Sequence, residues 1–181
     1  MIEEAGIDFD ALVDLAPDMP LGLGSGAGVI FGTSGGVAEA VVRRCLNSNK
    51  QYLSSEKIEM TSIRGFDNVK EATLTLAGQE IRIAVVHGMK DAQQLIAEIF
   101  DGSRSYHLVE VMSCKGGCVG GAGQPYGLTP VKRERASGLY SADKMSGIRS
   151  SDENPIITYL YENVVKGRAH EMLHVHHKLP E

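Results

Sequence analysis

Alternating apolar and polar residues predict most of the strands of this chain. From Val69 to His87 the apolar positions recur at every second residue on both sides of an Ala-Gly-Gln link, which predicts a β-hairpin. Apolar runs predict two further strands, a brief one at 29–31 and another at 106–112. Because helical patterns separate these runs, we expect an α/β fold, a single lobe in which a small mixed or parallel sheet is flanked by helices.

Helical spacing of apolar residues predicts two helices beside that sheet. The first runs from Val37 to about Leu46, with Val37, Val41 and Cys45 on one face. The second runs over 91–100. A glycine turn precedes the first helix, and a strand, glycine turn and helix in succession direct helix N–H groups toward an anionic or electron-rich ligand.

The pattern changes after residue 130. A charged helix is predicted at 132–140, and Ser-Asp-Glu-Asn-Pro at 151–155 is a cap-plus-proline signal for a second helix. The apolar face of that second helix is expected to hold Ile156, Tyr159 and Leu160. Such helices have little core of their own, so we expect residues 1–130 to form one lobe and 131–181 a helical tail packed on it.

The other segments are expected to be connections. Residues 1–20 are predicted to be a short helix or an irregular arm, 22–28 a flexible glycine run, and 47–57 a polar loop. The glycine pattern at 22–27 imitates a dinucleotide-binding fingerprint. No strand precedes it and no matching acid follows about twenty residues on, which favours a loop.

Composition narrows the function classes. With 181 residues and a net charge of −5, the chain has no basic run interleaved with aromatics, which argues against a nucleic-acid or anionic-membrane partner. No apolar stretch approaches 18 residues, so no membrane span is expected. Three cysteines do not make a secreted disulfide framework, and the first twenty residues carry acids where a signal peptide needs a basic start. We expect a cytoplasmic protein.

The stretch 110–125, Glu-Val-Met-Ser-Cys-Lys-Gly-Gly-Cys-Val-Gly-Gly-Ala-Gly-Gln-Pro, carries the candidate chemistry. Cys114 and Cys118 are close enough in sequence to bind one metal centre, and the glycines between them let backbone N–H groups approach the sulfurs. Two cysteines at this spacing are also compatible with buried, inert thiols. The flanking residues decide in favour of a metal-binding loop.

At these residues the chain resembles the iron-only (FeFe) hydrogenases. Their third signature has the pattern Glu-x-Met-x-Cys-x-Gly-Gly-Cys-x-x-Gly-Gly-Gly-Gln-Pro. The matching residues are Glu110, Met112, Cys114, Gly116, Gly117, Cys118, Gly121, Gly123, Gln124 and Pro125. Two residues depart from it. Ala122 stands where relatives usually have glycine, and Lys115 stands where they often have proline. Both changes are expected to tune a reduction potential without removing a ligand.

The resemblance extends over nearly the whole chain. Phe-Gly-Thr-Ser-Gly-Gly-Val-Ala-Glu-Ala at 31–40 is similar to a family segment upstream of the signature. Beyond residue 130, Arg135-x3-Leu139-Tyr140, Asn154-Pro155 and His-Glu-Met-Leu-His-Val-His at 170–176 are similar to the family's small-subunit-like tail. The opening residues resemble a segment interior to the catalytic domain.

The resemblance implies roles for particular residues. Cys114 would bind a four-iron (4Fe-4S) cubane, and Cys118 would bridge the cubane to a diiron subcluster where protons and electrons combine to dihydrogen. The pocket around this six-iron H-cluster would include Phe31, Met112, Gly116, Gly117 and Gln124. No catalytic proton-relay residue is expected in this chain, and the electron partner would be a ferredoxin-type carrier.

Two thiolates are half of what a cubane needs, which is about four. Cys45 matches no ligand of the family pattern, and the family's first two signatures lie outside this sequence. We therefore expect one lobe of an iron-only hydrogenase catalytic domain, completed by an N-terminal lobe or a partner subunit and inactive alone. A split-subunit or sensory module that binds an iron–sulfur cluster with a partner chain is the alternative.

A third interpretation comes from His170-Glu-x-x-His174, which matches the zinc-peptidase motif of two histidines one helical turn apart with a glutamate base. Only seven residues follow His174, which leaves no room for the usual third ligand downstream. Histidines of the tail packing against the lobe are the simpler interpretation.

Overall fold

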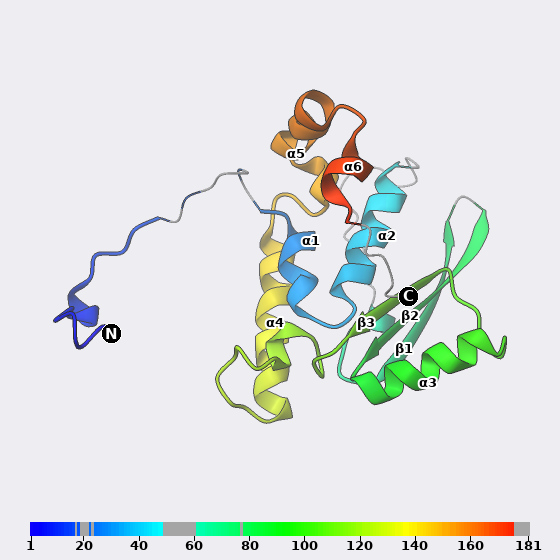
Figure 1. Cartoon of the computed structure of the whole chain (residues 1–181), viewed down its shortest axis with the longest axis horizontal. Coiled ribbons are helices and arrows are strands. Elements are labelled where there is room, and N and C mark those ends of the chain that lie inside the picture. The colour runs from blue at the N-terminus through cyan, green and yellow to red at the C-terminus, as the bar shows by residue number, and fades with distance from the viewer. Residues whose placement is uncertain (17, 19–21, 23, 49–60, 77, 176–181) are drawn as a thin grey trace, which may run out of the picture.

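The predicted hairpin is confirmed and forms part of a mixed three-stranded sheet. The computed structural model describes residues 1–16, 18, 22, 24–48, 61–76 and 78–175. Strands β1 (Val69–Leu76), β2 (Gln79–His87) and β3 (Leu108–Met112) lie in the order β1-β2-β3. β1 pairs with β2 antiparallel, and β2 pairs with β3 parallel (Figure 1). β2 is therefore the central strand.

Two helices cover the two faces of this sheet. α2 (Gly36–Ser48) packs on one face and α3 (Met89–Phe100) on the other, as Figure 1 shows. Because side chains alternate along a strand, Ile83 and Val85 of β2 pack under α2, while Ala84 and Val86 pack under α3. The expected α/β fold, with a small mixed sheet flanked by helices, is confirmed.

The buried face of α2 differs from the one expected. Ala38, Val42 and Leu46 form the core contacts, whereas Val41 is 40% exposed and Val37 and Cys45 are only half-buried. The difference arises because α2 is covered from two directions. Its polar residues at 39 and 43 are also buried, in an ion-pair network. The buried apolar residues are therefore those at 38, 42 and 46, one position after the expected ones.

The strand expected at 29–31 is wrong. This segment is helical, with α1 (Gly26–Val29) followed by a 3-10 turn, Ile30–Gly32. Ser25 caps α1, its Oγ accepting the N–H of Gly28 at 3.2 Å. A Cβ on Gly26 would lie 2.1 Å from Oδ1 of Asp143, so glycine permits the close approach of α1 to the helix at 129–145. The last three residues of the expected flexible glycine run, 26–28, are thus helical.

The charged helix of the tail is longer than expected. α4 (Thr129–Met145) starts three residues before the predicted range and ends five after it, and packs against α1. Ser150 and Glu153 form a capping box, and Asn154 caps α5 (Pro155–Tyr159), as its sequence indicated. A π-helical turn, Leu160–Val165, and α6 (Ala169–Leu173) complete the tail.

Two apolar segments remain outside the core. The expected apolar face of α5 is largely exposed, with Tyr159 at 60% and Ile156 at 37%. Residues 1–16 form an irregular arm with one 3-10 turn, Phe9–Ala11, and extend away from the body (Figure 1). The polar loop expected at 47–57 lies beyond the described residues after Ser48, where α2 ends.

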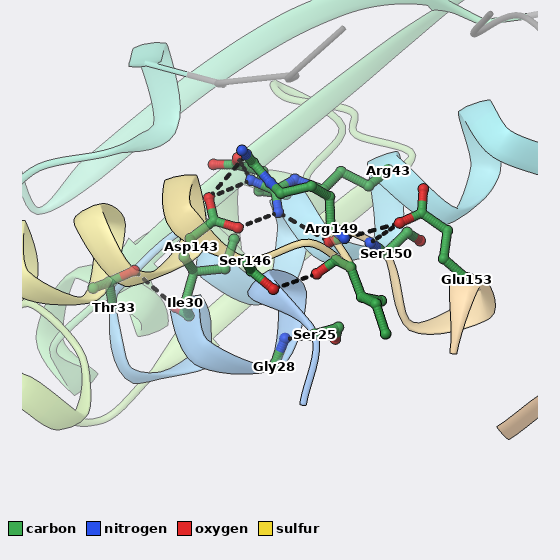
Figure 2. Close-up of polar contacts among 12 residues, drawn as sticks. Ser25, Gly28, Ile30, Thr33, Arg43, Asp143, Ser146, Arg149, Ser150 and Glu153 are labelled. Atoms are coloured by element: carbon green, nitrogen blue, oxygen red, sulfur yellow. Dashed lines mark hydrogen bonds and ion pairs between the residues drawn. The ribbon is translucent and has the colours of Figure 1, made fainter. Parts of the chain in front are cut away.

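A buried ion-pair network joins α2 to the tail. Arg43 donates to both oxygens of Asp143 at 2.7 and 2.8 Å and to Glu39 at 2.5 Å. Arg149 adds a bond to Asp143 at 3.0 Å (Figure 2). Arg64 donates to Glu39 at 2.8 and 2.9 Å. Burial by itself raises the pKa of Asp143, but the hydrogen bond and charge of Arg43 outweigh it, so the pKa is lowered overall.

We predict that Asp143→Asn lowers the free energy of unfolding by about 3–5 kcal/mol, because the amide leaves buried guanidinium charge uncompensated. Urea unfolding at pH 7 measures the change. Because the folded-state pKa of Asp143 is lowered, this stabilisation is present above the unfolded value of about 3.9 and is lost as the pH falls through the folded-state pKa. Glu98→Gln, in a partly exposed pair with Arg104, serves as the control and should cost below about 1 kcal/mol. Equal effects of the two substitutions would contradict the network's role.

Candidate metal centre

The cysteine loop leaves the sheet at the carboxyl ends of its two parallel strands, as expected. Met112 is the last residue of β3 and pairs with His87, the last residue of β2. The N–H of Gly88 donates to the Met112 carbonyl at 2.8 Å and holds the two strand ends together. Cys114 follows two residues later. Carboxyl ends of parallel strands are where ligands bind in α/β sheets.

The glycines between the cysteines are required by the backbone. Gly116 and Gly117 have φ values of +85° and +92°, which other residues rarely adopt. A Cβ on Gly117 would lie 2.6 Å from the backbone nitrogen of Ser34, so the loop packs directly on the backbone before α2. The N–H of Ser34 donates to the Gly116 carbonyl at 3.0 Å. The loop is thereby fixed to the segment that precedes α2.

Both cysteines of the loop expose their side chains to solvent. Cys114 begins a turn closed by a bond from the Gly117 N–H to the Cys114 carbonyl at 3.0 Å, and Cys118 begins a 3-10 turn, Cys118–Gly120. The Sγ of Cys114 lies 3.5 Å from where a Cβ on Gly121 would be, in ordinary contact. In the part of the chain that the structure describes, no group of three or more His, Cys, Asp or Glu side chains could hold a metal. The loop therefore offers two exposed cysteine side chains.

Glu110 anchors the strand before the loop to α2. Its carboxylate is buried and accepts the N–H of Gly35 at 2.6 Å and that of Ala38 at 2.8 Å. These N–H groups belong to the start of α2, where helical N–H groups lack partners within the helix and the helix dipole favours negative charge. The acid of the signature motif is thus a helix cap supplied by a neighbouring strand.

Lys70 is a buried cation that the sequence interpretation missed. Its Nζ donates to the carbonyl and the hydroxyl of Ser34, both at 3.1 Å, and to the Gly65 carbonyl at 3.0 Å. Burial lowers the pKa of Lys70 to about 8, against the opposing effect of the Glu110 charge. Ser34 is therefore held from two sides, by Lys70 and by the cysteine loop.

His87 was also missed. Its side chain is 1% exposed, and neither ring nitrogen has a hydrogen-bond partner within the described residues. Burial lowers the pKa of His87, and the charges of Lys70 and Lys115 lower it further. The alternating pattern could have predicted that both side chains are buried. Lys70 is two residues before Ala72 and His87 two residues after Val85, so each shares the inward face of its strand.

The remaining predicted pocket residues lie around the loop to different degrees. Phe31 is 47% exposed in the 3-10 turn before Gly32, whose carbonyl lies 2.8 Å from where a Cβ on Gly117 would be. Met112 is half-buried beside His87, and Gln124 is exposed. The structure brings Phe31, Met112 and the glycines toward one end of the sheet, and their roles in a pocket stay predictions.

The other candidate ligands lie apart from the loop. Cys45 is half-buried on α2. The rings of His170 and His174 are 4.6 Å apart between centroids, at and just beyond α6. Within the described residues they belong to no set of three possible metal ligands, so the geometry does not favour the zinc-peptidase interpretation.

Comparison with known families accounts for nearly the whole chain. The model of the iron-only hydrogenase large subunit, C-terminal domain, matches residues 1–122, and that of the iron hydrogenase small subunit matches residues 129–179. The chain belongs to the iron-only hydrogenase family.

Among curated relatives, the NADP-reducing hydrogenase subunit HndD of Solidesulfovibrio fructosivorans is 38% identical over 98% of this chain and 31% of that protein. Iron hydrogenase 1 of Clostridium pasteurianum is 37% identical over 98% of this chain and 33% of that protein. A solved FeFe-hydrogenase from Chlamydomonas reinhardtii superposes with a TM-score of 0.70 at 32% identity, over 97% of this chain and 52% of the other. The chain thus spans about a third of the length of these curated relatives.

Not every relative is named as a hydrogenase. Cytosolic iron-sulfur assembly component 3 of Mus musculus is 30% identical over 83% of this chain and 32% of that protein.

No helix within the described residues is both long and apolar enough to span a membrane.

We predict that Gly117→Ala lowers the free energy of unfolding by at least about 2 kcal/mol, because the added methyl meets the Ser34 backbone at a residue with φ of +92°. It should also reduce iron uptake by the loop during anaerobic reconstitution. Gly123→Ala is the matched control, because a Cβ there has open space and φ is not positive. Chemical unfolding and iron analysis check both variants, and a Gly117→Ala protein that behaves like Gly123→Ala would contradict the packing described.

Proposed function

We propose that this chain is part of an iron-only hydrogenase catalytic domain, and that Cys114 and Cys118 are two of the thiolate ligands of its six-iron cluster. The observation that carries the proposal is the pair of exposed thiols on a loop in which Gly116 and Gly117 leave no room for a Cβ. Family membership and the relatives named as hydrogenases support it. The reaction would be the reversible reduction of protons to dihydrogen.

The residues present fit half of such a site. Cys114 would bind the four-iron cubane, and Cys118 would be shared between the cubane and the diiron subcluster. When bound, this group supplies the metal chemistry of proton reduction and hydrogen oxidation. Phe31, Met112, Gly116, Gly117 and Gln124 would form the protein side of the pocket, where apolar packing strengthens electrostatic interactions and limits water.

The role of the described residues is to hold two thiolates in a fixed place. Glu110 fixes the strand before the loop to α2, and Ser34 fixes the loop itself by accepting from Lys70 and donating to Gly116. Lys70 and Lys115 bring positive charge toward this end of the sheet. Positive charge favours thiolate over thiol and stabilises an anionic cluster.

The rest of the cluster would be held from outside this chain. A cubane takes about four thiolates, and the loop offers two. We propose that the other ligands and the proton-relay residues belong to an N-terminal lobe or a partner subunit, and that this chain alone does not turn over hydrogen. Residues 1–130 would form the lobe and 131–181 the small-subunit-like tail, in a cytoplasmic protein served by a ferredoxin-type electron carrier.

A second function has some support from the relatives named as cytosolic iron-sulfur assembly components. The chain would then be a split-subunit or regulatory module that binds an iron–sulfur cluster with a partner and turns over no hydrogen. Higher identity to the hydrogenases, at 37–38% over 98% of the chain, favours the first proposal. Hydrogen evolution after completion with the missing ligands separates the two.

We predict that Cys114→Ala and Cys118→Ala each abolish most iron binding after anaerobic reconstitution with ferrous iron and sulfide, while Cys45→Ala retains it. Loss of a thiolate removes one of only two protein ligands, whereas Cys45 lies on α2 away from the loop. Metal analysis and the visible charge-transfer absorption of the cluster measure the outcome. Iron retained equally in all three variants would refute the metal site. Stoichiometric zinc that disappears in His174→Ala would instead support the zinc interpretation.

A further inference from the structure

A side chain of the tail holds the second half of the cysteine loop. Arg135, on α4, donates from Nη1 to the Val119 carbonyl at 3.2 Å and from Nη2 to the Pro125 carbonyl at 2.7 Å. These two carbonyls lie on either side of the glycine-rich stretch 120–124. One guanidinium therefore closes this stretch, because its rigid fork of N–H donors serves two acceptors at once.

The contact belongs to the face of α4 that packs on the loop. Lys132, one helical turn before Arg135, approaches the same loop, since its Cδ lies 3.3 Å from where a Cβ on Gly120 would be. Val119 is itself only 5% exposed. α4 thus lies directly against the turn that begins at Cys118 (Figure 1).

The two halves of the loop are fixed by different parts of the fold. Ser34, beside the sheet, donates to the Gly116 carbonyl and so fixes the first turn. The second turn is closed by a local bond from the Gly121 N–H to the Cys118 carbonyl at 3.0 Å, and its long-range support comes from Arg135. Because the ligands of a metal centre need a fixed relative geometry, the tail matters to the site as well as the core.

We propose that Arg135 is a positioning residue for Cys118, so that the helical tail takes part in building the iron–sulfur site, an inference that rests on the function proposed above. Arg135 binds backbone carbonyls and is not itself a ligand. It acts through residues 119–125, which keep the Cys118 thiolate where a cluster shared with Cys114 needs it. Without this clamp the loop keeps both cysteines but loses their preorganised arrangement, and iron binding becomes weaker.

The first test measures amide hydrogen exchange in the iron-free full chain. Arg135→Met keeps an unbranched side chain but has no donor. Exchange at Gly121 and Gln124 should become at least about tenfold faster, because a hydrogen bond from a charged donor is worth at least that factor. Ser34, whose N–H bonds the first turn, should stay as protected as in wild type. Faster exchange at all three amides, or at none, would overturn the proposal.

The second test measures iron bound after anaerobic reconstitution with ferrous iron, sulfide and a small thiol that supplies the remaining ligands. Arg135→Met should bind several-fold less iron than wild type, and the visible charge-transfer absorption should weaken in proportion. Arg135→Lys keeps the charge but presents one ammonium in place of the fork, so it should restore only part of the uptake. Full restoration by lysine would show that charge alone matters, against the proposal.

Arg104→Met is the matched control. Its guanidinium is also partly exposed, but it pairs with Glu98 at 2.8 Å, before the start of β3 and away from the cysteine loop. Both its iron uptake and its exchange at Gly121 should equal those of wild type. An equal loss of iron in the Arg104 and Arg135 variants would refute a specific role. Urea unfolding checks that Arg135→Met is folded, and if it is not, the exchange and iron uptake of Arg135→Lys decide.

Failure of this inference and failure of the proposed function give different results. If wild type takes up no iron, the proposed function fails, and the role of Arg135 toward the cluster falls with it. If wild type binds iron and Arg135→Met binds as much, only this inference is wrong.

Discussion

The arrangement of the candidate site depends on one carboxylate. Glu110, in the middle of β3, accepts two backbone N–H groups at the start of α2. It thereby joins the strand that leads into the cysteine loop to the helix that covers the sheet. A buried carboxylate at a helix N-terminus gains from both charged hydrogen bonds and the helix dipole. The Ser34 contact with the loop lies within one residue of this cap. The two thiolates are therefore positioned by the core of the fold, although they are themselves exposed.

A second buried network gives the tail its place. Glu39 and Arg43 lie on the same helix that Glu110 caps and pair with each other. Arg43 also binds Asp143 of α4, which accepts a further bond from Arg149. Removing one partner of such a network is costly, because the remaining charges stay buried. α2 thus connects the sheet, the cysteine loop and the tail. Its polar residues at 39 and 43 are buried and join it to the tail through ion pairs, where an ordinary amphipathic helix would use apolar contacts.

The sequence was informative wherever one periodicity dominated. The hairpin, the helix at 91–100 and the position of the cysteine loop after a strand followed from alternation and helical spacing. The ligand pair rests on the signature motif alone and stays a prediction. The strand expected at 29–31 was wrong because three apolar residues cannot distinguish a strand from a helical turn. Buried charges caused the other errors. Lys70 and Arg43 are polar residues that long-range partners draw inward, and a single sequence does not name those partners.

The most direct test of the account is amide hydrogen exchange at Ser34 in wild type and in Glu110→Gln. The glutamine retains an acceptor for one helix N–H and presents an amide donor to the other, so the cap is half lost. If Glu110 fastens the loop to α2, exchange should become faster at Gly35 and Ala38 and also at Ser34, whose N–H bonds the Gly116 carbonyl. Faster exchange at Gly35 and Ala38 with Ser34 as protected as in wild type would contradict the coupling between the cap and the cysteine loop.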